Sequence, residues 1–192
     1  KVQSQDLYQL SFCYFQTKRW DKAIAGFKQV NNGSDSLAQN SMYLLATSYL
    51  KIDDKQGAKN AFLFCSTQSQ NLLQKEISLF NYGKLSVELK EYAQAVVSLD
   101  QFMDTYPNSN YLIESKQLWV KALALNSNYV QALEAFESIE TPNEELLKIY
   151  PTILFGRSVI YINDGQIDKA YALLHKITTL ANNQNVISQT KF

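Results

Sequence analysis

One short stretch decides the fold of this chain: Trp20-Asp21-Lys22-Ala23-Ile24-Ala25-Gly26-Phe27, in which Phe27 follows Ala23 by four residues. An alanine with an aromatic residue or Leu four residues later recurs four more times. The five pairs are Ala23 and Phe27, Ala58 and Phe62, Ala95 and Leu99, Ala132 and Phe136, and Ala170 and Leu174. Successive alanines are 35, 37, 37 and 38 residues apart. A period in this range predicts a repeat architecture.

Each repeat carries the pattern of two packed helices. Seven residues after each alanine stands another apolar residue, and the spacing i, i+4, i+7 defines one face of a helix. These residues are Val30, Cys65, Phe102, Ile139 and Ile177. Twelve residues before each alanine stands a position that is small in four of five repeats, namely Ser11, Ala46, Gly83, Val120 and Ser158. Small side chains at matched places let two helices approach closely, so we expect an upstream helix in every repeat.

The composition excludes several classes of protein. The 192 residues carry 18 basic and 18 acidic side chains, with 46% hydrophobic residues. This balance favours a folded chain, and the dispersed, matched charges disfavour a nucleic-acid partner. Six Gly and three Pro are few for a β-sandwich or barrel. No apolar run is long enough to span a membrane.

The repeats predict one helical domain over residues 1–181, with units near 4–34, 39–70, 76–107, 113–140 and 143–181. Residues 182–192 are expected to be a polar tail or the start of a further repeat. Asp53-Asp54, Asn126-Ser127-Asn128 and Asn163-Asp164-Gly165 have the composition of turns between paired helices. Because Pro151 favours the first turn of a helix, we expect a short separate helix over Glu144 to Tyr150.

This arrangement resembles the tetratricopeptide repeat family. Gly83, Ala95 and Pro107 match its pattern of a small residue, an alanine and a terminal proline. The departures are periods above 34 residues and the loss of the early Trp. The resemblance implies an all-α, right-handed superhelical solenoid of about five antiparallel helix pairs. The junction from Phe102 to Tyr111 also resembles bacterial periplasmic members that act in outer-membrane assembly, which implies a periplasmic or outer-membrane location rather than a cytoplasmic one.

The sequence offers little for catalysis. His175 is the only histidine, and it is expected at the solvent edge of the last helix. No phosphate-binding, zinc or nucleophile-elbow motif occurs. Cys13 and Cys65 stand alone in apolar helical patterns and are interpreted as small buried hydrophobic residues. We therefore expect no enzyme activity, no catalytic residue, no bound metal and no cofactor.

The resemblance implies that the upstream helices line the inside of the curve, and it points to a candidate partner-binding set. Four of the five residues three positions before the small site are aromatic, and aromatic side chains are typical interface anchors. The candidate residues are Tyr8, Phe12, Tyr43, Thr47, Phe80, Lys84, Gln117, Lys121 and Phe155. Two interpretations stay open at this point: the rings form a partner groove, or they pack against adjacent repeats.

The function that this implies is a non-catalytic scaffold that binds a protein or peptide segment on its concave face, as part of a larger repeat protein. A clamp for the acidic tails of chaperones is disfavoured, because Thr47 and aromatic residues stand where such clamps carry Lys and Asn. Apolar residues in the terminal helices, such as Leu10 and Leu180, suggest self-association. The alternatives are an envelope assembly factor, a regulatory domain that senses a signalling peptide and, last, an enzyme.

Overall fold

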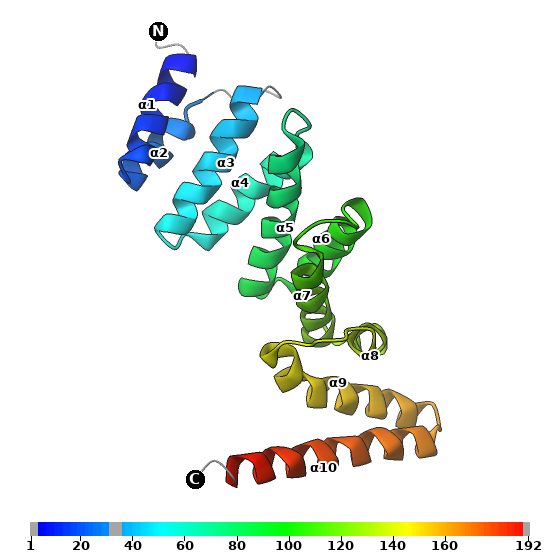
Figure 1. Ribbon diagram of the computed structural model, residues 1–192. Coiled ribbons are helices and arrows are strands. Elements are labelled where there is room, and N and C mark those ends of the chain that lie inside the picture. Colours follow the sequence, from blue (N-terminus) through cyan, green and yellow to red (C-terminus); the bar gives the residue numbers. More distant parts are fainter. Residues whose placement is uncertain (1–3, 31–35, 190–192) are drawn as a thin grey trace. The chain divides into compact units, whose positions relative to one another are not determined.

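The structure, a computed structural model, describes residues 4–30 and 36–189, with the side-chain surroundings given as far as residue 180. All regular elements in these ranges are α-helices, and no strand occurs among them (Figure 1). The helices are α1 (Ser4–Gln16), α2 (Trp20–Phe27), α3 (Ser36–Lys51), α4 (Lys55–Thr67), α5 (Leu72–Glu88), α6 (Tyr92–Thr105), α7 (Leu112–Leu125), α8 (Tyr129–Glu137), α9 (Glu144–Asn163) and α10 (Ile167–Gln189). The predicted all-α class is confirmed.

Five helix pairs share one turn, and this turn repeats in register with the alanines. In each pair the residue five positions before the alanine has a positive φ: Lys18 (58°), Asp53 (59°), Lys90 (63°), Ser127 (61°) and Gly165 (72°). The next amide donates a hydrogen bond back to a carbonyl in the last turn of the preceding helix, for example from Asn128 to Leu123 at 2.9 Å. This 6→1 bond is the Schellman end of a helix. We call α1, α3, α5, α7 and α9 the first helices of the pairs.

The five repeat alanines are all buried, each with at most 2% of its surface exposed. The residues four positions later are buried as well in the first four pairs, and Leu174 of the last pair is half-buried. Because alanine has no side chain beyond Cβ, it lets the second helix approach its neighbours while the larger residue one turn later fills the space beside it. The predicted hydrophobic seam of the repeats is therefore present.

The expected separate helix over Glu144 to Tyr150 is wrong, because α9 runs unbroken from Glu144 to Asn163 with Pro151 inside it. A proline in a helix removes one backbone hydrogen bond and crowds the carbonyl four residues earlier. Here an apolar face outweighs that cost: Leu146, Tyr150 and Leu154 are all buried and lie four residues apart on both sides of the proline. Breaking the helix would split this face.

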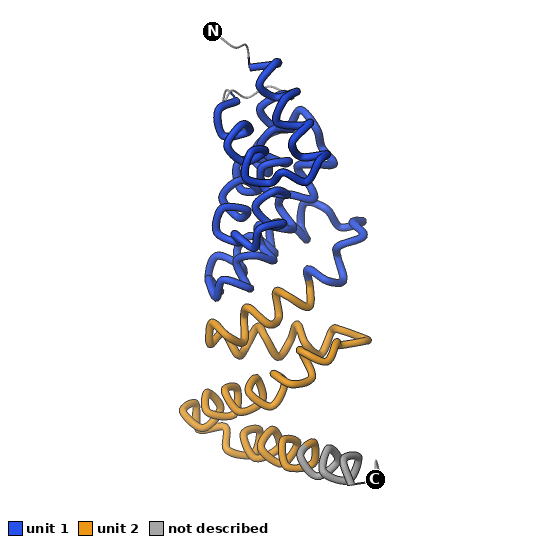
Figure 2. The backbone as a smooth tube through the Cα atoms, turned by 90° about the vertical axis from the view of Figure 1, so that its left-hand side faces the viewer, with its two compact units in different colours: residues 1–115 blue, residues 116–192 orange. Residues whose placement is uncertain are grey.

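The chain divides into two compact units, Lys1–Ser115 and Lys116–Phe192 (Figure 2). In the first unit, α3 packs on α1, α2, α4 and α5, and the core gathers around Phe27, Ala46 and Phe62. The first helices of this unit also contact one another in order, α1 with α3 and α3 with α5. They therefore form a row of adjacent helices. In the second unit, α9 packs on α8 and α10.

Candidate functional site

The first helices position the aromatic candidates, and α1 is the first of them. Tyr8 and Phe12 lie one turn apart, with their rings stacked at 6.2 Å between centroids. The Tyr8 ring also lies 6.0 Å from Phe27 of α2, and burial raises the pKa of its phenol. Phe12 keeps 37% of its surface exposed. The pair thus has an inner ring that packs on the core and an outer ring that is available to a partner.

The aromatic candidates of α3 and α5 pack against other rings of the first unit. Phe80 of α5 is only 3% exposed, because its ring lies between Phe102 at 5.7 Å and Tyr111 at 4.5 Å. Tyr43 of α3 is half-buried against Phe62 at 6.1 Å, and burial first, then the nearby Tyr111, raises the pKa of its phenol. Tyr111 was missed by the sequence pattern because it precedes α7 and has no repeat register. Phe80 is therefore buried by packing within the chain, and its ring is not exposed in a groove for a partner.

The polar candidates of the first unit are engaged within the chain. Thr47 donates a hydrogen bond to the carbonyl of Tyr43 at 2.9 Å, which is a local helix bond. Lys84 pairs with the carboxylate of Glu114 at 2.8 Å, and its ammonium also lies 5.7 Å from the centre of the Phe80 ring. The Lys84 pair joins the end of α5 to the first turn of α7.

The second unit repeats this connection one pair later. Lys121 of α7 pairs with Glu145 of α9 at 2.7 Å, and this lysine lowers the pKa of the Glu145 carboxyl. Gln117 donates to the carbonyl of Thr141 at 3.2 Å and accepts a hydrogen bond from Asn143. Lys121 and Gln117 therefore both contact the start of α9 or the segment that leads into it, and these contacts engage their polar groups. Sequence patterns did not reveal these partners, because the segment is irregular in length.

Phe155 is the most exposed of the aromatic candidates. This residue keeps 57% of its surface exposed on α9. Val159 and Ile162 follow at the spacing i+4 and i+7 and are 39% and 47% exposed. Residues at this spacing lie on one face of a helix, so the three side chains form an apolar stripe, which we call the α9 stripe. Of the three, only Phe155 was among the candidate residues predicted from the sequence.

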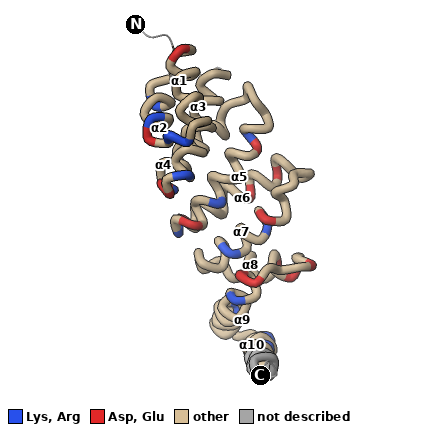
Figure 3. Tube along the Cα trace, turned by 60° about the vertical axis from the view of Figure 1, so that its left-hand side comes forward, with Lys and Arg blue, Asp and Glu red and all other residues tan. Residues whose placement is uncertain are grey.

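The described residues do not gather catalytic groups. His175 is exposed, as predicted. Cys65 is buried, but Cys13 is exposed, so its predicted burial is wrong. The reason is helical geometry: Cys13 follows the buried Ser11 by two residues, about 200° around α1, and so points to the other side. No group of three His, Cys, Asp or Glu side chains within the described ranges has a metal-binding arrangement. Basic and acidic residues are interspersed along the trace (Figure 3).

None of the helices that the structure describes is long and apolar enough to cross a membrane.

Comparison with known proteins identifies the repeat. The family model of the tetratricopeptide repeat matches residues 7–32 and 78–109, which cover most of α1 with all of α2, and most of α5 with all of α6. No curated protein matches the chain.

Solved structures agree with this match. The chain is similar to the TPR-like repeats of a putative kinesin light chain from Podosopora anserina, with 16% identity, a TM-score of 0.50, and coverage of 94% of this chain and 95% of that chain. It is also similar to YrrB, described as a TPR protein with an unusual peptide-binding site, with 16% identity, a TM-score of 0.52, and coverage of 97% and 90%. MamA AMB-1 gives 14% identity, a TM-score of 0.52, and coverage of 91% and 96%. The predicted resemblance and repeat fold are confirmed.

Proposed function

Because the chain has the tetratricopeptide repeat fold, we propose that it is a non-catalytic scaffold that binds a protein or peptide segment on its first helices. Stacked repeats present side chains of successive helices on one surface, and such surfaces are used for binding. YrrB, one of the similar structures, is itself described as having a peptide-binding site. The proposal assigns the contacts to the side chains of the first helices that internal packing leaves exposed.

The single observation that carries this proposal is the α9 stripe. Phe155, Val159 and Ile162 are large apolar side chains on one helix face, each between 39% and 57% exposed. Burying one such side chain completely contributes about 1.5–3 kcal/mol. Aromatic residues, Phe among them, are enriched at protein interfaces. On α1, Phe12 offers a second exposed ring in the candidate set.

The chemistry of the partner follows from which candidate side chains remain exposed. Lys84 and Lys121 are paired with Glu114 and Glu145, so a partner carboxylate would have to displace an existing ion pair. The exposed members of the set are apolar. We therefore infer a partner segment with apolar anchors, such as one face of an amphipathic helix or an extended strand with alternating apolar residues.

The test compares two exposed aromatic residues on different helices. Peptides selected from a random library against the whole chain are titrated against the natural sequence, Phe155→Ser and Tyr171→Ser. Tyr171 is 69% exposed on α10, a second helix, so its replacement removes an exposed aromatic ring outside the proposed surface. We expect Phe155→Ser to weaken binding at least about tenfold and Tyr171→Ser to leave it unchanged. Equal affinities for all three proteins would refute the proposal.

We also propose weak self-association through α1, where Leu10 is 51% exposed. Sedimentation velocity at increasing concentration measures it, with Leu10→Ser as the variant that should lower the association constant. A mass that stays monomeric at every concentration would argue against it. The envelope role and the periplasmic location stay predictions from the sequence.

A further inference from the structure

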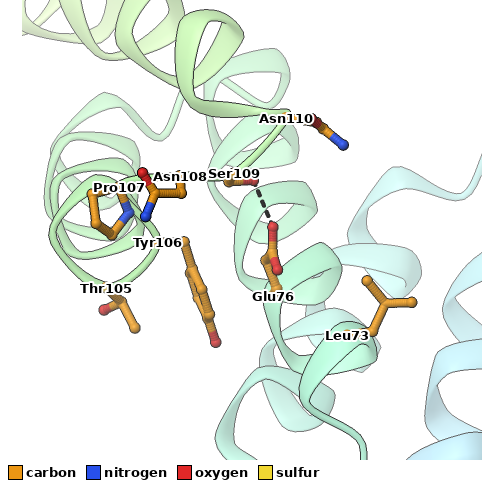
Figure 4. A pocket seen from close by; sticks show the side chains of 8 residues that line it. All are labelled: Leu73, Glu76, Thr105, Tyr106, Pro107, Asn108, Ser109 and Asn110. Carbon is orange, nitrogen blue, oxygen red and sulfur yellow. Dashed lines mark hydrogen bonds between the residues drawn. The ribbon is translucent and has the colours of Figure 1, made fainter.

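The first unit contains a cavity that is separate from the first-helix residues discussed above. It has a volume of about 430 Å³ and lies between the start of α5 and the connection from α6 to α7. Figure 4 shows Leu73 and Glu76 of α5 on one side, with Tyr106, Pro107 and Asn108 of the connection on the other. Its size is within the range of sites that take one ligand group or one large side chain.

Glu76 supplies the only formal charge among the residues that line this cavity. The Ser109 hydroxyl donates to its carboxylate at 2.6 Å, and the same Ser109 oxygen accepts a hydrogen bond from the amide of Tyr111 at 3.1 Å. The carboxylate is therefore held in one orientation by a residue that is itself fixed. No lysine or arginine within the described ranges pairs with it. The neighbouring Lys75 has its ammonium 3.4 Å from Ser69 instead.

The rest of the lining complements a cation on an apolar stem. The ring of Tyr106 borders the cavity, and an aromatic face attracts a cation that lies above it. Leu73, which is 65% exposed, provides an apolar edge at the mouth. Asn108 and Asn110 add side-chain amide oxygens, which accept hydrogen bonds. Burial first, and then the charge of Glu76, raises the pKa of the Tyr106 phenol.

We propose that this cavity binds a lysine or arginine side chain of a partner polypeptide, with the cationic head on Glu76, the methylene stem against Leu73 and Tyr106, and the peptide backbone outside. An ion pair with a fixed carboxylate gives charge-assisted hydrogen bonds, which are stronger than neutral ones. The inference rests on the proposed function in that the ligand is a peptide. It uses none of the residues of the α9 stripe, so each of the two proposals is tested by its own variants.

The experiment uses the whole chain labelled with ¹⁵N and two blocked pentapeptides. One has a central arginine flanked by alanines, and the other has citrulline, which is uncharged and nearly the same shape, in its place. We expect the arginine peptide to shift the amide signals of residues 105–110 and the citrulline peptide to bind at least about tenfold more weakly, which corresponds to about 1.4 kcal/mol. Blocked arginine alone is the third probe, and it should shift the same signals, because the side chain carries the recognition.

Two variants of equal charge loss separate the cavity from general electrostatics. Glu76→Gln removes the carboxylate, and Asp104→Asn removes an exposed carboxylate of α6 outside the cavity. We expect binding of the arginine peptide to fall about tenfold in Glu76→Gln and to stay within twofold in Asp104→Asn. Equal binding of the citrulline peptide, equal binding by Glu76→Gln, or shifts that avoid residues 105–110 would each overturn the proposal. The citrulline comparison needs no variant, so a folding defect of Glu76→Gln cannot obscure the result.

Discussion

Replacing Gly156 by alanine tests how closely α8 and α9 approach. A β-carbon at Gly156 would lie 2.5 Å from Cε2 of Tyr129 and closer still to Cδ2 and Cγ of the same ring. Ordinary van der Waals contacts of a β-carbon begin near 3.4 Å. The ring or the helix therefore has to move by roughly an ångström. Overpacking of this kind costs about 1–3 kcal/mol, and a contact with three ring atoms belongs to the upper end of that range.

The same substitution also has a favourable effect. Alanine in a helix interior is about 1 kcal/mol more stable than glycine. We therefore expect Gly156→Ala to lower the free energy of unfolding by about 2 kcal/mol, the difference between the clash and the helix propensity. In a Tyr129→Ala background the ring is absent, and the substitution should raise the free energy of unfolding by about 1 kcal/mol.

Urea unfolding followed by far-ultraviolet circular dichroism measures all four proteins of this cycle. The informative quantity is the change of sign between the two backgrounds, with a coupling energy of about 3 kcal/mol. If Gly156→Ala has the same effect with and without the Tyr129 ring, the close approach of α9 to α8 at this residue is not what fixes the glycine, and the packing argument for the last repeats fails.

Three further predictions follow from single side chains. Ser127→Gly should raise the free energy of unfolding by about 0.5–1 kcal/mol in urea unfolding, because a positive φ costs a non-glycine residue about 1–2 kcal/mol; Asn128→Gly, at φ −87°, is the control and should not stabilise. The ion pair lowers the pKa of Glu145, so its contribution is present above the unfolded-state pKa and is lost as pH falls through the lowered folded pKa. The stability difference from Glu145→Gln, less than about 1 kcal/mol at neutral pH, should vanish in acid, and a constant difference would contradict the assignment. Cys13 should react with a thiol reagent in the native chain and Cys65 only after unfolding, since burial raises the pKa of the Cys65 thiol and covers it; two fast native thiols would refute this.

The repeat was predictable from sequence because it depends on local geometry. An alanine and a larger residue four positions later can both be buried only on one helix face, and the turn five residues upstream has a fixed backbone shape. The turn itself was only partly visible. Gly165 and the Asn-Ser-Asn run around Ser127 have turn composition, whereas Lys18 and Lys90 adopt the same positive φ without any composition signal. At these lysines the packing of the two helices imposes the conformation.

The candidate site was less predictable, because exposure depends on what the next segment of chain supplies. Phe80 and Phe155 stand at the same position of their repeats, yet they are 3% and 57% exposed. Tyr111, from the connection that follows α6, stacks on Phe80 and covers it. That connection is irregular, and its contacts have no counterpart in the repeat pattern. Sequence spacing therefore placed both rings at the same position of a first helix and left the burial of each ring undetermined.

The residue directly after the small site also differs in its surroundings from repeat to repeat. This difference bears on what the chain binds. Lys84 and Lys121 occupy it in two consecutive repeats, and each pairs with a glutamate near the start of the following first helix. Since these lysines already pair with carboxylates of the same chain, they have little charge left for a partner. Phe12 and Val159 occupy the same position on α1 and α9, where it is apolar and at least 37% exposed. Recognition at this position of the first helices is therefore expected to be apolar, and charge selectivity to come from Glu76 of α5, which lines the cavity.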